Sequence, residues 1–183
     1  HTFKNNGWKY SNFSYDFNRL NITSDSEWKS ISNTRGELIP SYPPLLFVPS
    51  KVSAEDIQSS INFRCLGRFP VLTYRHNHTQ CSLIRSAQPL NSQAQAYLQS
   101  DISLLDAYRT SGILNQLREN QIHDNPPILY IIDARSLLAI AANRAGGKGT
   151  EDVGSYVNSH LVMCDIDNIH VMRNSIISFA TSL

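Results

Sequence analysis

Two short apolar runs near the end of the chain constrain the fold most strongly. Residues 128–132 and 161–164 are hydrophobic throughout, which is the pattern of strands buried on both faces. Between them, residues 136–145 contain strong helix formers and are followed by the glycine-rich segment 146–149. Because strand, helix and strand follow one another in this order, we expect a sheet with helices packed against it.

The earlier part of the chain predicts further strands and helices around this unit. The runs 71–75 and 81–85 flank a polar turn, which is the pattern of an antiparallel hairpin. Strands are also expected near Trp28 and at 45–48, and helices at 14–20 with Ser14 as cap, from Ser53, within 91–120 with a break near Gly112, and at 170–183. Together these elements predict an α/β fold with a mixed central sheet and flanking helices.

Composition narrows the domain organisation and the class of partner. The 183 residues, 41% of them hydrophobic, suit one globular domain. A net charge of +1 gives no support to nucleic-acid binding. Three cysteines without a CxxC pair favour a reducing compartment, and no apolar run approaches the ~20 residues of a membrane span. The chain opens on a polar segment and stops within a helical pattern, so we expect residues 1–183 to be a single incomplete domain.

Two motifs suggest a bound cofactor or metal, but neither matches the known binding pattern in detail. The segment 146–150 resembles a P-loop, but Gly149 separates Lys148 from Thr150, and the loop follows a helix instead of a strand. A glycine-rich helix end accounts for it better. The turn with His76, His78 and Cys81 offers metal-ligand types without a second ligand pair at zinc-site spacing. We therefore expect neither a metal nor a cofactor.

Several polar residues stand where predicted strands and helices end. Asp133 closes an apolar strand, but Arg135 follows it, so a structural ion pair or a helix cap is as plausible as catalysis. Asn168 precedes the last helix, where it can cap the helix or face an anion. Cys164 lies among apolar neighbours and has the setting of a buried hydrophobe, not of a nucleophile. The residues alone therefore provide no complete active site.

Ten short motifs occur in an order that resembles the myotubularin family of 3-phosphoinositide phosphatases, and together they cover almost the whole chain. They are 28–32 (WKSIS), 41–43 (SYP), 47–49 (FVP), 63–64 (FR), 67–72 (GRFPVL), 85–90 (RSAQPL), 133–135 (DAR), 142–145 (ANRA), 147–149 (GKG) and 168–173 (NIHVMR). None is decisive alone, but their joint order is specific.

The resemblance implies the N-terminal half of a cysteine-dependent, protein tyrosine phosphatase-like domain. Such a domain removes the 3-phosphate of PtdIns3P and PtdIns(3,5)P2 through a cysteinyl-phosphate intermediate. No cysteine here has an arginine six residues later, so the catalytic Cys-x5-Arg loop is expected outside this chain and no catalytic residue is assigned. The matching positions imply that Asn143, Asn168 and Ile169 bind the substrate headgroup.

The resemblance also implies partners and a location. The expected partners are a phosphoinositide headgroup at a membrane surface, the remainder of the phosphatase domain, and a second, identical or related myotubularin in an oligomer. The expected location is cytoplasmic, peripheral on endosomal membranes. An alternative is a catalytically inactive scaffold that keeps the fold and binds an active homologue.

Overall fold

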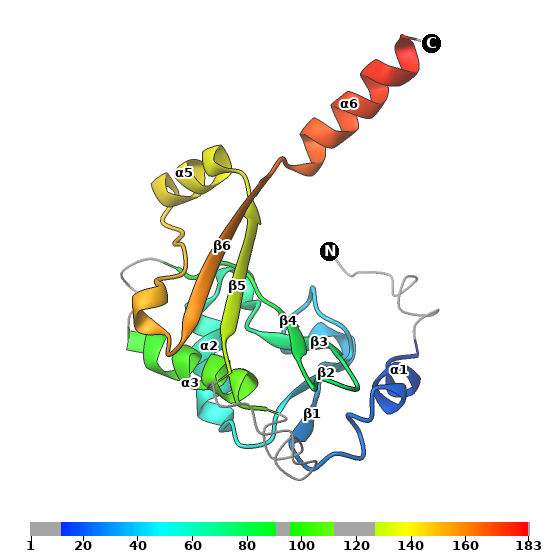
Figure 1. Cartoon of the computed structure of the whole chain (residues 1–183), viewed down its shortest axis with the longest axis vertical. Helices are drawn as coiled ribbons and strands as arrows, with labels where there is room; N and C mark the ends of the chain where they lie inside the picture. The colour runs from blue at the N-terminus through cyan, green and yellow to red at the C-terminus, as the bar shows by residue number, and fades with distance from the viewer. Residues whose placement is uncertain (1–11, 91–95, 112–126, 183) are drawn as a thin grey trace.

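The computed structural model describes residues 12–90, 96–111 and 127–182, and its elements follow the predicted order (Figure 1). They are α1 (Phe13–Arg19), β1 (Trp28–Ser32), β2 (Leu45–Pro49), α2 (Ala54–Phe63), β3 (Val71–Arg75), β4 (Ser82–Arg85), α3 (Leu98–Arg109), β5 (Leu129–Arg135), α5 (Leu137–Ala145), β6 (Ser159–Ile166) and α6 (Ile169–Thr181). The expected break near Gly112 lies outside the described residues.

Strand pairing is mixed, as predicted, but it is divided among small sheets. β1 pairs with β2 and β3 with β4 in antiparallel fashion, and the second pair carries an irregularity between Leu72 and Tyr74. β5 and β6 run parallel. Within residues 12–90, 96–111 and 127–182 these are three separate two-stranded sheets, so the prediction of one central sheet is not met there.

Short polar side chains start the helices. The Ser53 hydroxyl accepts a hydrogen bond from the N–H of Asp56 at 2.9 Å, and the Ser136 hydroxyl caps α5 in the same way. The predicted cap of the first helix was wrong, because Asn12 and not Ser14 accepts the free N–H, that of Tyr15. Each cap fixes where the chain turns from loop to helix.

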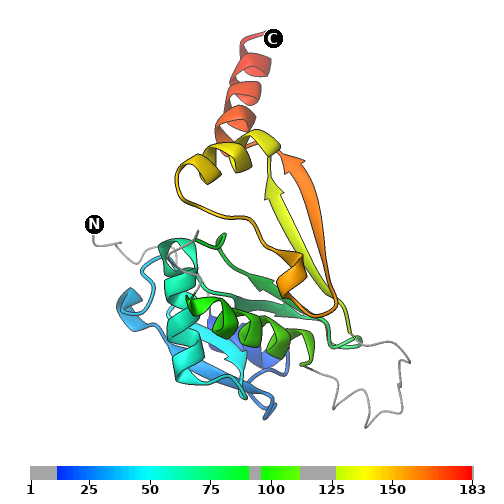
Figure 2. The same ribbon diagram turned by 90° about the vertical axis from the view of Figure 1, so that its left-hand side faces the viewer.

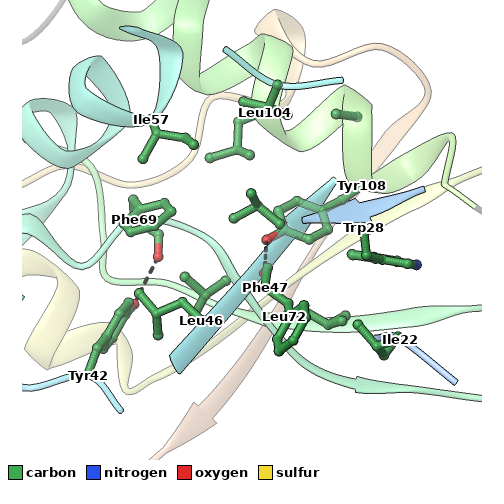
Figure 3. Close-up of a cluster of buried hydrophobic side chains, with 14 of the residues drawn as sticks. Ile22, Trp28, Tyr42, Leu46, Phe47, Ile57, Phe69, Leu72, Leu104 and Tyr108 are labelled. Carbon is green, nitrogen blue, oxygen red and sulfur yellow. Dashed lines mark hydrogen bonds between the residues drawn. The ribbon is translucent and has the colours of Figure 1, made fainter. Parts of the chain in front are cut away.

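One hydrophobic core lies between the two antiparallel pairs and the helix pair α2–α3 (Figures 2 and 3). Two buried tyrosines tie it to the backbone: the Tyr42 hydroxyl donates to Phe69 O at 2.9 Å, and the Tyr108 hydroxyl donates to Phe47 O at 3.2 Å. The cluster comprises Phe17, Leu20, Ile22, Trp28, Ile39, Tyr42, Leu46, Phe47, Val48, Val52, Ile57, Phe69, Val71, Leu72, Leu104, Ala107 and Tyr108.

The C-terminal part of the chain stands outside this core. β5 and β6 form a ribbon that extends from the body towards α5 and α6 (Figure 1). Tyr130 and Ile132 are each 62% exposed, and the apolar side chains of α6 are exposed as well. The prediction that both strands are buried on two faces was therefore wrong for the described chain. Apolar sequence shows that a strand can be covered, but it does not show which segment covers it.

A buried arginine joins elements that are far apart in the sequence. The side chain of Arg64, at the end of α2, is fully buried, and its Nε lies 3.0 Å from Oδ1 of Asp101 on α3. The guanidinium also pairs with Glu151, beyond α5, and donates to Ala87 O at 3.0 Å. Burial alone would lower the pKa of Arg64, but Asp101 and Glu151 outweigh it and raise that pKa. The arginine thus stays charged and links α2, α3 and the segment after α5.

In the described ranges, no helix combines the length and the hydropathy that a membrane span requires.

Replacing Arg64 should destabilise the protein strongly. In an Arg64→Met variant, Asp101 remains buried without its cation, and breaking such a pair costs about 3–5 kcal/mol. Urea unfolding should report this loss. The control is Arg19→Met, on the exposed side of α1, which should change little. A loss below about 1 kcal/mol for Arg64→Met would contradict the linking role.

Alkaline pH should weaken the fold through its buried tyrosines. Burial raises the pKa of Tyr42 from 10.0 to about 12, and it raises the pKa of Tyr108 and Tyr156 as well. The folded state therefore favours the neutral phenols. Their contribution to stability is complete below about pH 10 and is lost as the pH rises through the folded-state values. The free energy of unfolding should fall over this interval.

A substitution separates this effect from general alkaline damage. Tyr42→Phe should flatten the fall in the free energy of unfolding between about pH 10 and pH 12, because one titrating phenol is removed. Tyr15→Phe, at a ring that is 64% exposed, should leave the slope as it is. Equal slopes for the wild type and Tyr42→Phe would contradict the assignment.

Candidate functional site

The site residues proposed from the sequence lie towards one end of the β5–β6 ribbon. Because the two strands are parallel, their carboxyl ends point the same way. α5 follows β5 and carries Asn143, and α6 follows β6 and begins at Ile169 (Figure 1). Both helices therefore begin at the same end of the ribbon.

Asn143 is half-buried in the last turns of α5, and its amide is partly engaged. Its Nδ2 donates to Ala139 O at 2.7 Å, and its Oδ1 accepts a hydrogen bond from Nε2 of Gln88 at 3.2 Å. An asparagine amide has two donor hydrogens and two acceptor lone pairs. One hydrogen and one lone pair therefore have no partner in the described part of the chain and are available to a ligand.

A chain of polar side chains leads from β5 to Asn143. Asp133 and Arg135 form an ion pair with Nε–Oδ1 and Nη2–Oδ2 distances of 2.9 and 2.5 Å. The hydrogen bond from Arg135 lowers the pKa of Asp133, against a smaller opposing effect of burial, and keeps the carboxylate charged. Arg135 Nη1 then donates to Oε1 of Gln88 at 2.6 Å. The ion pair, one of the alternatives considered for Asp133, is present, and it is linked through Gln88 to Asn143.

The glycine-rich segment ends α5, as the sequence predicted. Gly147 adopts a φ of +76°, which favours glycine, and the N–H of Lys148 returns to Asn143 O at 3.0 Å. The N–H of Gly149 then donates to Pro89 O at 2.8 Å. The segment 88–90 thus holds the end of α5 through its backbone as well as through the Gln88 side chain.

Asn168 caps α6 and leaves part of its amide free. Its Oδ1 accepts from the N–H groups of His170 and Val171 at 2.9 and 3.2 Å, while Nδ2 has no partner among the described residues. Ile169, the first helical residue, is 77% exposed, and no acceptor for its backbone N–H lies in the described part of the chain. Free N–H groups at a helix N-terminus attract anions.

Asn143 and Asn168 lie towards the same end of the ribbon, and no hydrogen bond joins them. Asp165, at the end of β6, instead connects β6 with the start of α5, because its Oδ1 accepts a hydrogen bond from the N–H of Leu137 at 2.9 Å. A hollow of about 280 Å³ also lies beside α5, and it is lined by Leu137, Ile140, Ala141, Arg144, Thr150, Leu161 and Met163.

Two further candidates from the sequence are Cys164 and the turn that contains His76, His78 and Cys81. Cys164 is exposed, so the prediction that it is a buried hydrophobe was wrong. His76 contacts Thr79 through Nδ1 at 2.9 Å within the β3–β4 turn. In the described ranges, no three His, Cys, Asp or Glu side chains are grouped as a metal site would need.

Sequence reasoning missed Gln88. It lies in the RSAQPL motif after the hairpin, but a glutamine there gives no chemical signal by itself. Its contact with residues about 50 positions later appears only once the chain is folded. The motif follows β4 and lies beside α5, where Pro89 bridges to Arg64 and Leu90 bridges to Lys148. This position brings the Gln88 side chain to Arg135 and Asn143.

The chain is similar in sequence to known proteins along nearly all of its length. The sequence model of the myotubularin-like phosphatase domain matches residues 1–183. The chain is 34% identical over 174 residues to phosphatidylinositol-3,5-bisphosphate 3-phosphatase MTMR2 of Pongo abelii, covering 95% of this chain and 25% of that protein. It is 36% identical to myotubularin of Xenopus laevis over 176 residues, covering 95% and 27%. The chain thus spans about a quarter of the length of these relatives. By this match along its whole length, the chain belongs to the family of the myotubularin-like phosphatase domain.

Proposed function

We propose that the protein containing this chain is a lipid phosphatase that removes the 3-phosphate of PtdIns3P and PtdIns(3,5)P2. Membership of the myotubularin-like family supports a phosphoinositide phosphatase, because relatives such as MTMR2 carry the name phosphatidylinositol-3,5-bisphosphate 3-phosphatase. The observation that carries the proposal is the delivery of Asn143 and of the Asn168–Ile169 helix start to one end of the β5–β6 ribbon.

The proposed role of this chain is to bind the inositol headgroup. The free Nδ2 hydrogens of Asn143 and Asn168 suit hydroxyl and phosphate oxygens, and they add no charge to the site. The backbone N–H of Ile169 and the α6 dipole suit a phosphate group. Both kinds of donor can hold an anionic sugar without competing for the proton that the reaction must move.

Bond breaking is assigned to a Cys-x5-Arg loop outside this chain. There a thiolate would attack the phosphorus, the inositol 3-oxygen would leave with a proton from an acid, and water would release phosphate from the cysteinyl phosphate. Residues 1–183 should therefore be inactive alone. Action at endosomal membranes, with a second myotubularin as partner, belongs to the same proposal.

The activity itself is the first test. The full-length protein should release phosphate from vesicles that contain PtdIns3P and should leave PtdIns4P vesicles unchanged. A protein that binds PtdIns3P vesicles without releasing phosphate would favour the alternative function, a catalytically inactive scaffold. Turnover by residues 1–183 alone would contradict the placement of the catalytic loop elsewhere.

Asn168 allows its capping role to be separated from substrate binding. Asn168→Asp keeps the Oδ1 acceptor that caps α6, but it removes the Nδ2 donors and adds a negative charge near the phosphate. This variant should fold normally, and its kcat/KM for PtdIns3P should fall by roughly tenfold or more, because a hydrogen bond to a charged group contributes about 1.5–3 kcal/mol.

Asn168→Ala provides the comparison for that experiment. It removes the cap and the donors together, so both the thermal stability and kcat/KM should fall. If Asn168→Asp retained the wild-type kcat/KM, Asn168 would have no place in the headgroup site, and its role would be limited to capping.

A further inference from the structure

Gln88 is engaged at both ends of its side-chain amide. Oε1 accepts from Nη1 of Arg135 at 2.6 Å, and Nε2 donates to Oδ1 of Asn143 at 3.2 Å. The guanidinium can only donate, so the oxygen of Gln88 has to face Arg135. The NH2 group of Gln88 is then directed to Asn143, and a reversed amide would place donor against donor.

The same logic fixes the amide of Asn143. Nε2 of Gln88 requires an acceptor, so Oδ1 of Asn143 faces it, and Nδ2 turns towards Ala139 O at 2.7 Å. With Arg135 as the donor at one end and Ala139 O as the acceptor at the other, the amides of Gln88 and Asn143 can each adopt one orientation only. The Asp133 carboxylate starts this order, because it holds Arg135 through two hydrogen bonds.

The backbone of Gln88 is anchored to the chain at the end of α2. Its backbone carbonyl accepts from the N–H of Cys65 at 3.0 Å, and the next residue, Pro89, forms a bridge with the buried Arg64. The Gln88 side chain therefore connects α5 to the segment at the end of α2. Within α5, Ala139 O is the one partner of the Asn143 side chain among the described residues.

We propose that Gln88 is a positioning residue for substrate: it fixes the carboxamide of Asn143 so that one Nδ2 hydrogen and one Oδ1 lone pair are presented to the inositol headgroup. This inference rests on the proposed phosphoinositide function. Gln88 acts through Asn143 and has no contact of its own with substrate. As a headgroup contact away from the bond that breaks, Asn143 is expected to bind the substrate and the transition state equally, so losing its orientation should raise KM and leave kcat nearly constant.

The discriminating variant is Gln88→Glu in the full-length protein. It is nearly isosteric, and one carboxylate oxygen still accepts from Arg135. The second oxygen, however, opposes Oδ1 of Asn143 and drives that amide out of its orientation. The matched control is Gln58→Glu, which adds the same charge at an exposed position of α2. Gln88→Met, which lacks both hydrogen bonds, is a second variant in case Gln88→Glu unfolds.

Two readouts separate positioning from a structural role. Gln88→Glu should keep the wild-type denaturation midpoint, while KM for short-chain PtdIns3P and Kd for inositol 1,3-bisphosphate rise roughly tenfold, the loss of about one hydrogen bond. In an Asn143→Ala background the same substitution should change neither constant further, since Gln88 acts through that amide. Gln58→Glu should match the wild type.

Each outcome decides the inference. Unchanged KM and Kd in both Gln88 variants would overturn it, and so would an additive effect in the Asn143→Ala background. A fall in kcat alone would also overturn it, because orientation of a binding group does not predict that result. If the wild-type protein neither bound inositol 1,3-bisphosphate nor hydrolysed PtdIns3P, the proposed function would fail and this inference with it. If the wild type bound inositol 1,3-bisphosphate and both Gln88 variants bound it equally well, this inference alone would fail.

Discussion

The buried guanidinium of Arg64 is the contact on which the rest of the structure depends. It pairs with Asp101 on α3 and Glu151 after α5, and the adjacent Pro89 bridge places the segment 88–90. A fully buried charge is costly to hold, and here two carboxylates and the Ala87 carbonyl satisfy it. This single group therefore connects the hydrophobic core to the part of the chain that carries Asn143, and it does so with directional bonds that a purely apolar contact cannot supply.

Beyond the contacts of Arg64, the chain continues into the β5–β6 ribbon, which has little packing of its own. The core cluster ends at Tyr108 in sequence, whereas β5, β6 and α6 expose much of their apolar surface. Hydrogen bonds hold α5 and the loop after it in place: Gln88 to Asn143, Gly149 to Pro89, and Leu137 to Asp165 of β6. The headgroup site proposed above is thus built from polar contacts on a weakly covered frame, and its geometry is sensitive to single side chains.

Local patterns in the sequence predicted the elements well, because caps and turns are decided by near neighbours. Ser53 and Ser136 start their helices, Gly147 ends α5, and the hairpin around residues 76–80 forms as expected. Burial was predicted poorly, since the apolar run of β5 carries no information about what covers it, and Tyr130 and Cys164 prove exposed. Gln88 was missed for a related reason: its partners lie about 50 residues away, and only the fold brings them together.

The central claim is that the free donors of Asn143 and Asn168 bind an inositol phosphate headgroup. The most direct measurement is a nuclear magnetic resonance titration of the full-length protein, labelled with ¹⁵N on asparagine side chains, with inositol 1,3-bisphosphate. The account predicts that the Nδ2 resonances of Asn143 and Asn168 shift together and saturate at one ligand concentration, while that of the core residue Asn33, whose amide is already bonded to Ile39 O and Tyr42 O, stays in place. Saturable binding that leaves the Asn143 and Asn168 resonances unmoved would contradict it.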